Sequence, residues 1–232
     1  MVLSAANLAD LSKFNQSFPQ FYQRLATSEV QHQNYLLAYH FYRNHSSAFR
    51  LRKISSERSL ILLAHHNSPW LLAEIFALLL QQQVTVQRFS LQAQVHRPKL
   101  VFLRLVVSAN CQAITPAQAE TLQSQIQALS KEKAIQFNLV KLDDIQADFA
   151  IDRVCHLPLI TIASPPHPEF CAQVFAALAQ EDLQLISANL AIAKGRIKAR
   201  FYMLGPDGQT IPDHLGLRIA NGLRQALMYG RG

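Results

Sequence analysis

Glycine is missing from most of this sequence. All seven glycines of the 232 residues occur at or after position 195: Gly195, Gly205, Gly208, Gly216, Gly222, Gly230 and Gly232. Phosphate-binding loops need closely spaced glycines, because the backbone must approach the phosphate. The late glycines fit neither the G-x-G-x-x-G pattern nor the Walker A pattern. The sequence therefore excludes nucleotide binding by either of these loops.

Cysteines, charges and long apolar runs are also scarce. The three cysteines, Cys111, Cys155 and Cys171, show no C-x-x-C spacing, which favours reduced thiols in a cytoplasmic protein. No apolar run approaches the roughly 18 residues of a membrane span. The N-terminus lacks the basic start and apolar block of a secretory signal. With 50% hydrophobic and 16% charged residues, the chain can bury a large core.

Two stretches, residues 67–92 and 167–191, resemble each other. Pro69 and Pro168 open the aligned run, so the offset is 168 − 69 = 99. Without any gap, this offset aligns Ala73 with Ala172, Ile75 with Val174, Phe76 with Phe175, Leu79 with Leu178 and Leu91 with Leu190. We interpret the pattern as one structural unit that is used twice.

Hydrophobic periodicity predicts the elements of the first unit. Residues 1 to about 56 are expected to be helical, with 49–58 as a basic connector. A strand at 60–65 is followed by a helix that Ser68 caps and Pro69 begins. A hairpin at 84–108, a helix from Thr115-Pro116 and a strand at 135–142 complete the order β-α-β-β-α-β.

The same order begins again after a predicted connector at 143–156. We expect a strand at 158–164, a helix ending near 180, strands at 183–193 and 196–204, and a final helix at 213–229. The last strand of this second unit is missing. The predicted class is α+β, with two ferredoxin-like units in tandem. The predicted domains are a helical segment at 1–56 and units at 57–142 and 156–232.

The outer faces of the two predicted sheets differ. In the strand at 196–204, Arg196, Lys198 and Arg200 alternate with apolar residues, which indicates a half-buried strand with a basic outer face. In the strand at 100–107 both faces are apolar, apart from Arg104. Its outer face is therefore expected to be covered, by the N-terminal helices, by the second unit or by another chain.

The repeat resembles a tandem pair of ACT domains. The segments that carry this resemblance are LILLAHHNSPWLLAEIFALLLQQQVTVQRFSLQ and LITIASPPHPEFCAQVFAALAQEDLQLISANLA, each a strand, a polar turn with proline, a helix and a second strand. Residues 58–232 resemble the C-terminal ACT pair of bacterial uridylyltransferase/uridylyl-removing enzymes. The catalytic parts of those enzymes have no counterpart here.

The resemblance implies regulation by a small molecule, often an amino acid, that binds at a domain interface beside the first strand–helix turn. The corresponding residues here are Asn67, Ser68 and Trp70 in the first copy, and Pro166, His167 and Glu169 in the second. Trp70 and Glu169 stand where the family commonly has a glycine. Their bulk obstructs close approach of a ligand to the backbone.

Two functions stay open at this stage. The first is a non-catalytic cytoplasmic sensor that self-associates and binds a metabolite at these turns, without a cofactor or a metal. His65 and His66 point to opposite faces of a strand and cannot easily share a metal. The second is an interaction module with a degenerate ligand site, in which Arg196, Lys198 and Arg200 bind an acidic protein partner. RNA binding is not favoured, because the aromatic Phe201 lies on the inner face.

Overall fold

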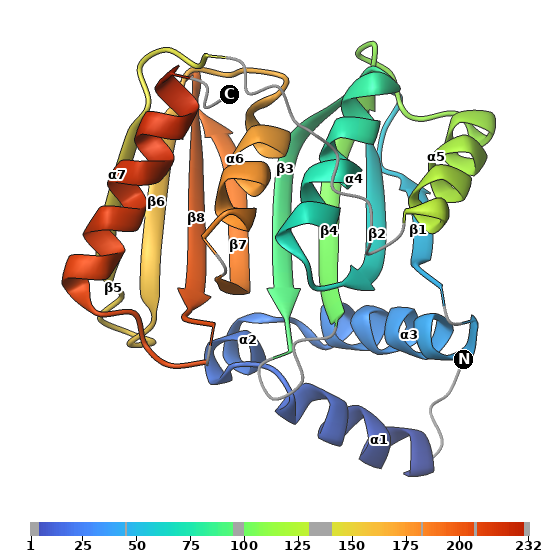
Figure 1. Ribbon diagram of the computed structural model, residues 1–232. Coiled ribbons are helices and arrows are strands. Elements are labelled where there is room, and N and C mark those ends of the chain that lie inside the picture. The colour runs from blue at the N-terminus through green and yellow to red at the C-terminus, as the bar shows by residue number, and fades with distance from the viewer. Residues whose placement is uncertain are drawn as a thin grey trace.

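The computed structural model describes residues 5–44, 46–94, 100–129, 141–181, 183–206 and 208–229 (Figure 1). The helices are α1 (Ala5–Gln16), α2 (Gln20–Leu25), α3 (Ser28–Asn44), α4 (Pro69–Gln81), α5 (Pro116–Ala128), α6 (Phe170–Ala179) and α7 (Asp213–Tyr229). The strands are β1 (Ala48–Lys53), β2 (Ser59–His66), β3 (Val84–Ala93), β4 (Leu100–Ala109), β5 (Gln146–Ile151), β6 (Pro158–Ser164), β7 (Gln184–Ala193) and β8 (Arg196–Leu204).

All eight strands form one antiparallel sheet in the order β1-β2-β4-β3-β7-β8-β6-β5. Each half of the chain contributes four adjacent strands, and the halves meet where β3 pairs with β7 (Figure 1). The elements follow the order β-β-α-β-β-α in both halves. The prediction of a mixed helix and sheet protein is confirmed at this level.

Two predicted connectors are in fact edge strands. Residues 48–53, which were expected to lie in helix or basic connector, form β1, and 146–151 form β5. Both have alternating burial, typical of an edge strand with one covered face. Because β5 pairs with β6, it occupies the sheet position for which the sequence showed no final strand. Of the predicted strand at 135–142, residues 135–140 lie outside the described residues, and 141–142 are not in a strand.

The register of β3 and β7 reproduces the offset of the sequence repeat. Ser90 lies opposite Asn189, and 90 + 99 = 189, so each faces its own equivalent across the seam. Both strands are also irregular at equivalent places, between Val86 and Arg88 and between Leu185 and Ser187. The two halves are therefore related by an approximate two-fold axis that passes between Ser90 and Asn189.

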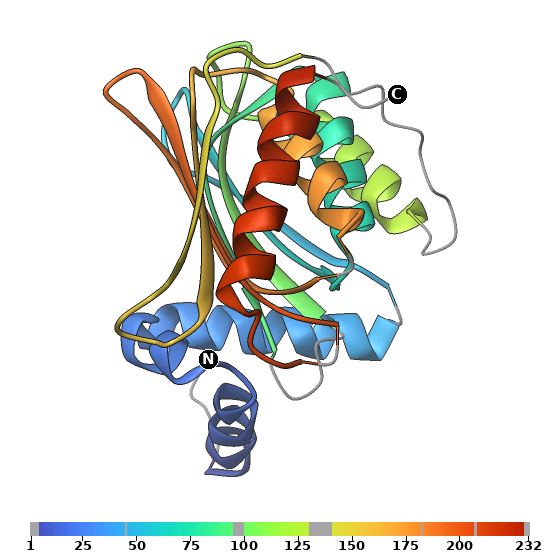
Figure 2. The ribbon, with the colours of Figure 1, turned by 60° about the vertical axis from the view of Figure 1, so that its left-hand side comes forward.

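Helices α4, α5, α6 and α7 all lie on one face of the sheet (Figure 2). The predicted helix starts are confirmed, since α4 begins at Pro69 after Ser68 and Thr115 forms a capping box with Gln118. At the centre of this layer the equivalent rings of Phe76 and Phe175 stack, with centroids 5.1 Å apart and planes at 6°. One continuous core thus crosses from one half to the other.

The N-terminal helices cover part of the other face. Phe18, Tyr22, Leu37, Ala38 and Phe41 from α1–α3 and their connections form a second buried cluster with Leu62, Ala64, Leu100 and Phe102 of the sheet. Both faces of β4 are consequently buried, as its sequence predicts, and the N-terminal helices provide the cover. These helices lie toward one end of the strands (Figures 1 and 2).

A pair of glycine substitutions in α7 is expected to have opposite effects on stability. A Cβ atom on the buried Gly216 would overlap the ring of Phe149 on β5, whereas at Gly222 the nearest heavy atom, an oxygen of Glu181, would be 3.6 Å away. Gly216→Ala should therefore lower the free energy of unfolding by about 1–3 kcal/mol, and Gly222→Ala should raise it by up to about 1 kcal/mol. Urea unfolding of both variants measures the difference. Equal stabilisation by both would contradict the packing of α7 on β5.

Candidate functional site

A cavity of about 260 Å³ lies between the two halves, beside the turn from β6 to α6. The second half contributes Pro166, His167 and Pro168 from the turn, Cys171 from α6, and apolar residues of β7 and β8. The first half contributes Phe76 and Leu80 from α4 and residues 84–86 from the start of β3. The cavity thus forms only where the seam brings the turn of one half against the helix and strand of the other.

Most of the cavity wall is apolar. Phe76, Val84, Leu190 and Ile197 are all buried there, and none of the lining side chains is a carboxylate, lysine or arginine. Such a wall favours an uncharged aliphatic or aromatic group and offers no partner for a buried charge. A ligand in this cavity would therefore place an apolar group inside and any charged group toward the rim.

His167 provides a polar group at this wall. Its Nδ1 accepts a hydrogen bond of 3.3 Å from the backbone N–H of Glu169. In the neutral ring this bond leaves the proton on Nε2, which can donate to a carboxylate or carbonyl oxygen. The neighbouring residues Pro165, Pro166 and Pro168 have no backbone N–H to offer. Recognition of an oxygen at this turn would consequently depend on the His167 side chain.

Cys171 is a small, buried wall residue whose environment disfavours the thiolate form. Burial raises the pKa of its thiol to about 12, because the thiolate would be desolvated. At the equivalent position, 171 − 99 = 72, the first half has the larger and fully buried Leu72. The smaller cysteine side chain leaves more room beside the second turn.

The turn of the first half makes a direct contact with the second half. Asn67 Nδ2 donates a hydrogen bond of 3.1 Å to the backbone oxygen of Leu185 on β7. The equivalent pair at the cavity is Pro166 and Val86, where a proline side chain cannot make this bond. Asn67 therefore ties one turn to the other half, while the equivalent place beside the second turn is part of the open cavity.

The structure brings together two of the six residues that the sequence places in the ligand site. Pro166 and His167 line the cavity, together with Pro168. Glu169 accepts a hydrogen bond from Gln173 along α6, and Trp70 packs against the main core. Ser68 caps α4 by position but makes no side-chain cap bond. None of these last three lines the cavity.

The sequence predictions missed the opposite wall of the cavity. Leu80, Val84 and Val86 come from the first half, and Ile192 and Ile197 come from the β7–β8 hairpin. These apolar residues give no local functional signal, because each also fits an ordinary core or strand position. The one available signal is the contrast between Cys171 and Leu72, which indicates a less tightly filled second copy.

The predicted basic strand has three different surroundings. Arg196 forms an ion pair with Asp144 and also donates to the backbone oxygen of that residue at 3.1 Å. Lys198 is exposed, as the alternation predicts. Arg200 lines a second cavity of about 470 Å³ on the outer face of the sheet, opposite α4–α7. The three residues therefore do not act as one uniform patch.

Comparisons with known proteins give little additional information. No family model matches the sequence, and no curated protein matches it. Among solved structures, the crystal structure of aspartate kinase from Synechocystis is similar over 75% of this chain and 27% of that chain, with 16% identity and a TM-score of 0.42. A likeness at this level carries no conclusion about function.

The fold and the cavity define the chain as a mixed helix and sheet protein with a ligand-sized space between two related halves. Within the described ranges, no helix has the length and apolar character needed to cross a membrane. The described part of the chain also has no group of three or more histidine, cysteine, aspartate or glutamate side chains suited to a metal ion.

Proposed function

We propose that this chain is a non-catalytic regulatory protein built from two ACT-like, ferredoxin-like units, and that it binds a small apolar metabolite in the cavity between them. Each half has the strands and helices of a βαββαβ unit, except that the fourth sheet position is filled by a strand that precedes the first, β1 or β5. The internal two-fold symmetry supports a duplicated unit. The proposal further includes a cytoplasmic location and self-association.

The observation that carries the proposal is the position and chemistry of the cavity of about 260 Å³. A cavity of about 150 Å³ with apolar walls can admit benzene, and drug-sized ligands need about 300 Å³ or more. The volume of this cavity lies between these two values, so the cavity suits a molecule the size of an aliphatic amino acid. The branched-chain amino acids and their 2-oxo acids combine an apolar group with a carboxylate that His167 Nε2 can bind at the rim.

Binding at this place would affect how the halves pack. The wall includes Phe76, whose ring stacks on Phe175 across the axis, and Val84 at the start of the seam strand β3. A ligand that touches both halves stabilises the arrangement in which they are close, by an amount set by its concentration relative to its Kd. This differential stabilisation is the physical basis of the proposed regulation.

A thermal-shift and calorimetry screen of the twenty amino acids and the branched-chain 2-oxo acids tests the proposal. We expect one or more aliphatic members to raise the melting temperature, with a stabilisation of about 2.7 kcal/mol at a ligand concentration 100 times the Kd. The double variant Pro166→Asn, Cys171→Leu gives the second half the side chains that the first half has at the equivalent positions, Asn67 and Leu72, and should abolish this effect. Pro165→Asn, on an exposed neighbour that does not line the cavity, should retain it. If no compound in the screen raises the melting temperature or gives a heat of binding, the sensor proposal is wrong.

A specific observation also supports the alternative, an interaction module for an acidic protein. Lys198 and Arg200 lie on the same outer face, and the net charge of the chain is +7. Because Asp144 already pairs with Arg196, the contribution of that residue to such a surface is reduced. Reversal of Lys198 and Arg200 to glutamate, followed by a pull-down from cell extract and identification of the lost protein, tests this alternative.

A further inference from the structure

The outer face of the sheet carries a second cavity that the proposed sensor function does not use. Its volume is about 470 Å³, within the range of pockets for small ligands. One side is formed by α2, α3 and the segment between them, and the other by the four central strands. The cavity therefore lies between the N-terminal helices and the seam of the two halves.

Three arginines, Arg88, Arg104 and Arg200, line this cavity. In register across the sheet, Arg104 lies opposite Ser90, Ser90 opposite Asn189, and Asn189 opposite Arg200. Arg104 and Arg200 thus lie on either side of the two-fold axis. Three strand spacings separate their Cα atoms, a distance of about 14 Å. Arginine side chains are long enough to extend over much of this distance, so both guanidinium groups can bind the same ligand.

The three guanidinium groups form no ion pair in the described ranges, where the ion pairs join Arg52 to Glu29, Lys141 to Asp143 and Arg196 to Asp144. Glu29 on α3 favours the charged form of Arg104, but its carboxylate also has other partners. Glu29 pairs with Arg52 at 3.8 Å and accepts from Gln33 Nε2 at 2.9 Å. Arg104 is therefore only partly compensated, by its interaction with Glu29, and Arg88 and Arg200 add two exposed positive charges to the same cavity, so an anion there would be attracted by all three.

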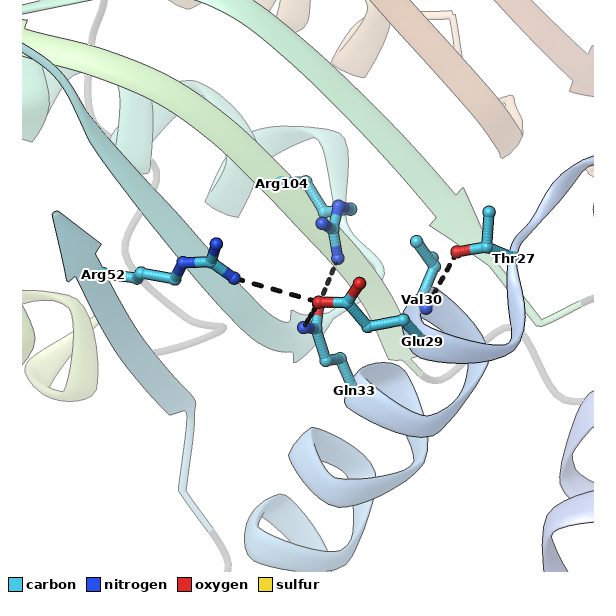
Figure 3. Close-up of polar contacts among 6 residues, drawn as sticks. All are labelled: Thr27, Glu29, Val30, Gln33, Arg52 and Arg104. Carbon is cyan, nitrogen blue, oxygen red and sulfur yellow. Dashed lines mark hydrogen bonds and ion pairs between the residues drawn. The ribbon is translucent and has the colours of Figure 1, made fainter. Parts of the chain in front are cut away.

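Arg104 is held in position from the helix side. Its Nη1 donates to Gln33 Oε1 at 2.6 Å, and Gln33 is in turn oriented by Glu29 (Figure 3). Burial lowers the pKa of Arg104, because the charged guanidinium is partly desolvated. A partly desolvated cation with a fixed orientation binds an oxyanion more strongly than a solvated surface cation does.

The cavity also offers polar groups for a ligand with hydroxyls. Asn34 is 2% exposed, and its Nδ2 donates to Tyr22 Oη at 2.7 Å. Its Oδ1 is buried without a hydrogen-bond partner, as is Oε1 of Gln92, and both residues line the cavity. Buried acceptors of this kind are normally satisfied, so a ligand that donates hydroxyl hydrogens would complete them.

We propose that this cavity is a second, anion-binding site, and that its ligand is a small hydroxylated metabolite with at least two negative charges on phosphate or carboxylate groups. Arg88, Arg104 and Arg200 bind the oxyanions, and Asn34 and Gln92 accept hydrogen bonds from the hydroxyls. The site is separate from the apolar cavity, which lies on the opposite face of the sheet beside α4 and α6.

Isothermal titration calorimetry with glucose 6-phosphate, pyrophosphate and citrate tests the site and distinguishes phosphate from carboxylate ligands. We expect saturable binding of at least one probe that weakens as salt rises. Arg88→Gln and Arg200→Gln, both at exposed positions, should each weaken it about ten- to a hundredfold. Lys198→Gln removes the same charge from the same strand face but lies outside the cavity, so it should change the affinity less than about twofold.

The outcomes separate this proposal from its alternatives. Arg104→Gln should also abolish binding, and the exposed variants decide the case if it fails to fold. The absence of saturable binding for all three probes, or equal losses in Lys198→Gln and Arg200→Gln, would overturn the site. Tighter binding of an acidic peptide or of single-stranded RNA than of any probe would overturn the small-molecule assignment. Retained binding in Pro166→Asn, Cys171→Leu shows that the result is independent of the sensor proposal.

Discussion

Replacing Phe175 with alanine is expected to lower the free energy of unfolding by about 3–5 kcal/mol. Phe175 is fully buried at the two-fold axis and stacks on Phe76. The centroid of its ring lies 5.9 Å from that of Phe89 on β3 and 5.8 Å from that of Phe201 on β8, so strands from both halves surround it. The substitution therefore leaves a cavity in the core that joins the halves. Urea unfolding of the variant and the parent chain measures the loss.

A double-mutant cycle with Phe76→Ala tests whether the stack itself contributes. Coupling between the two rings should be about 0.5–1.5 kcal/mol beyond the loss of buried area. Phe49→Ala, on the partly buried edge strand β1, is the matched control and should cost less than either core substitution. A loss at Phe175 no larger than at Phe49 would show that the halves are not joined by this core.

The repeat in the sequence predicted a duplicated unit, but it predicted neither the strand pairing between the two halves nor their outer limits. The offset of 99 reproduces the pairing of Ser90 with Asn189 and the stack of Phe76 on Phe175. These contacts follow from the repeat because residues on a two-fold axis meet their own equivalents. Pairwise symmetry is thus encoded in any duplicated sequence whose copies associate through the same strand and helix.

The edge strands β1 and β5 could not be recognised from local patterns. In β1 the apolar residues Phe49 and Leu51 alternate with Arg50, Arg52 and Lys53, so charge dominates the segment. Edge strands commonly carry such charges, which prevent pairing with other chains. In β5 no proline or glycine marks the boundaries. Their strand structure depends on pairing with β2 and β6, which is tertiary information.

The candidate site was likewise predicted only in part. The resemblance to ACT domains implies a ligand beside the first strand–helix turn, and the polar residues with prolines locate that turn at Pro166 and His167. The facing residues Val84 and Val86 lie at least 80 positions earlier, since 166 − 86 = 80, and reach the turn only through the pairing of β3 with β7. The contact of Asn67 with Leu185 likewise depends on a seam that no local pattern describes.

Removal of residues 1–46 is expected to increase self-association of the remaining chain beyond that of the full chain. The deletion takes away Phe18, Tyr22, Leu37, Ala38 and Phe41, and it uncovers Leu62, Ala64, Leu100 and Phe102 on the sheet. Each large side chain in this cluster contributes about 1.5–3 kcal/mol by burial. The exposed apolar face would then associate with another apolar surface, most directly that of a second copy of the chain. Light scattering after size-exclusion chromatography and dye binding to exposed apolar surface measure the change.

Two neighbours on β4 distinguish loss of this cover from general damage. Phe102 packs against Phe14 and Phe18 of the N-terminal region, with ring centroids 5.7 and 5.6 Å apart, whereas Leu103 belongs to the main core on the opposite face. Phe102→Ala should cost about 3–5 kcal/mol in the full chain and much less after the deletion. Leu103→Ala should cost about 2–5 kcal/mol in both, because its surroundings do not change. A truncated chain that self-associates no more than the full chain, with an unchanged cost at Phe102, would show that α1–α3 are not the cover of this face.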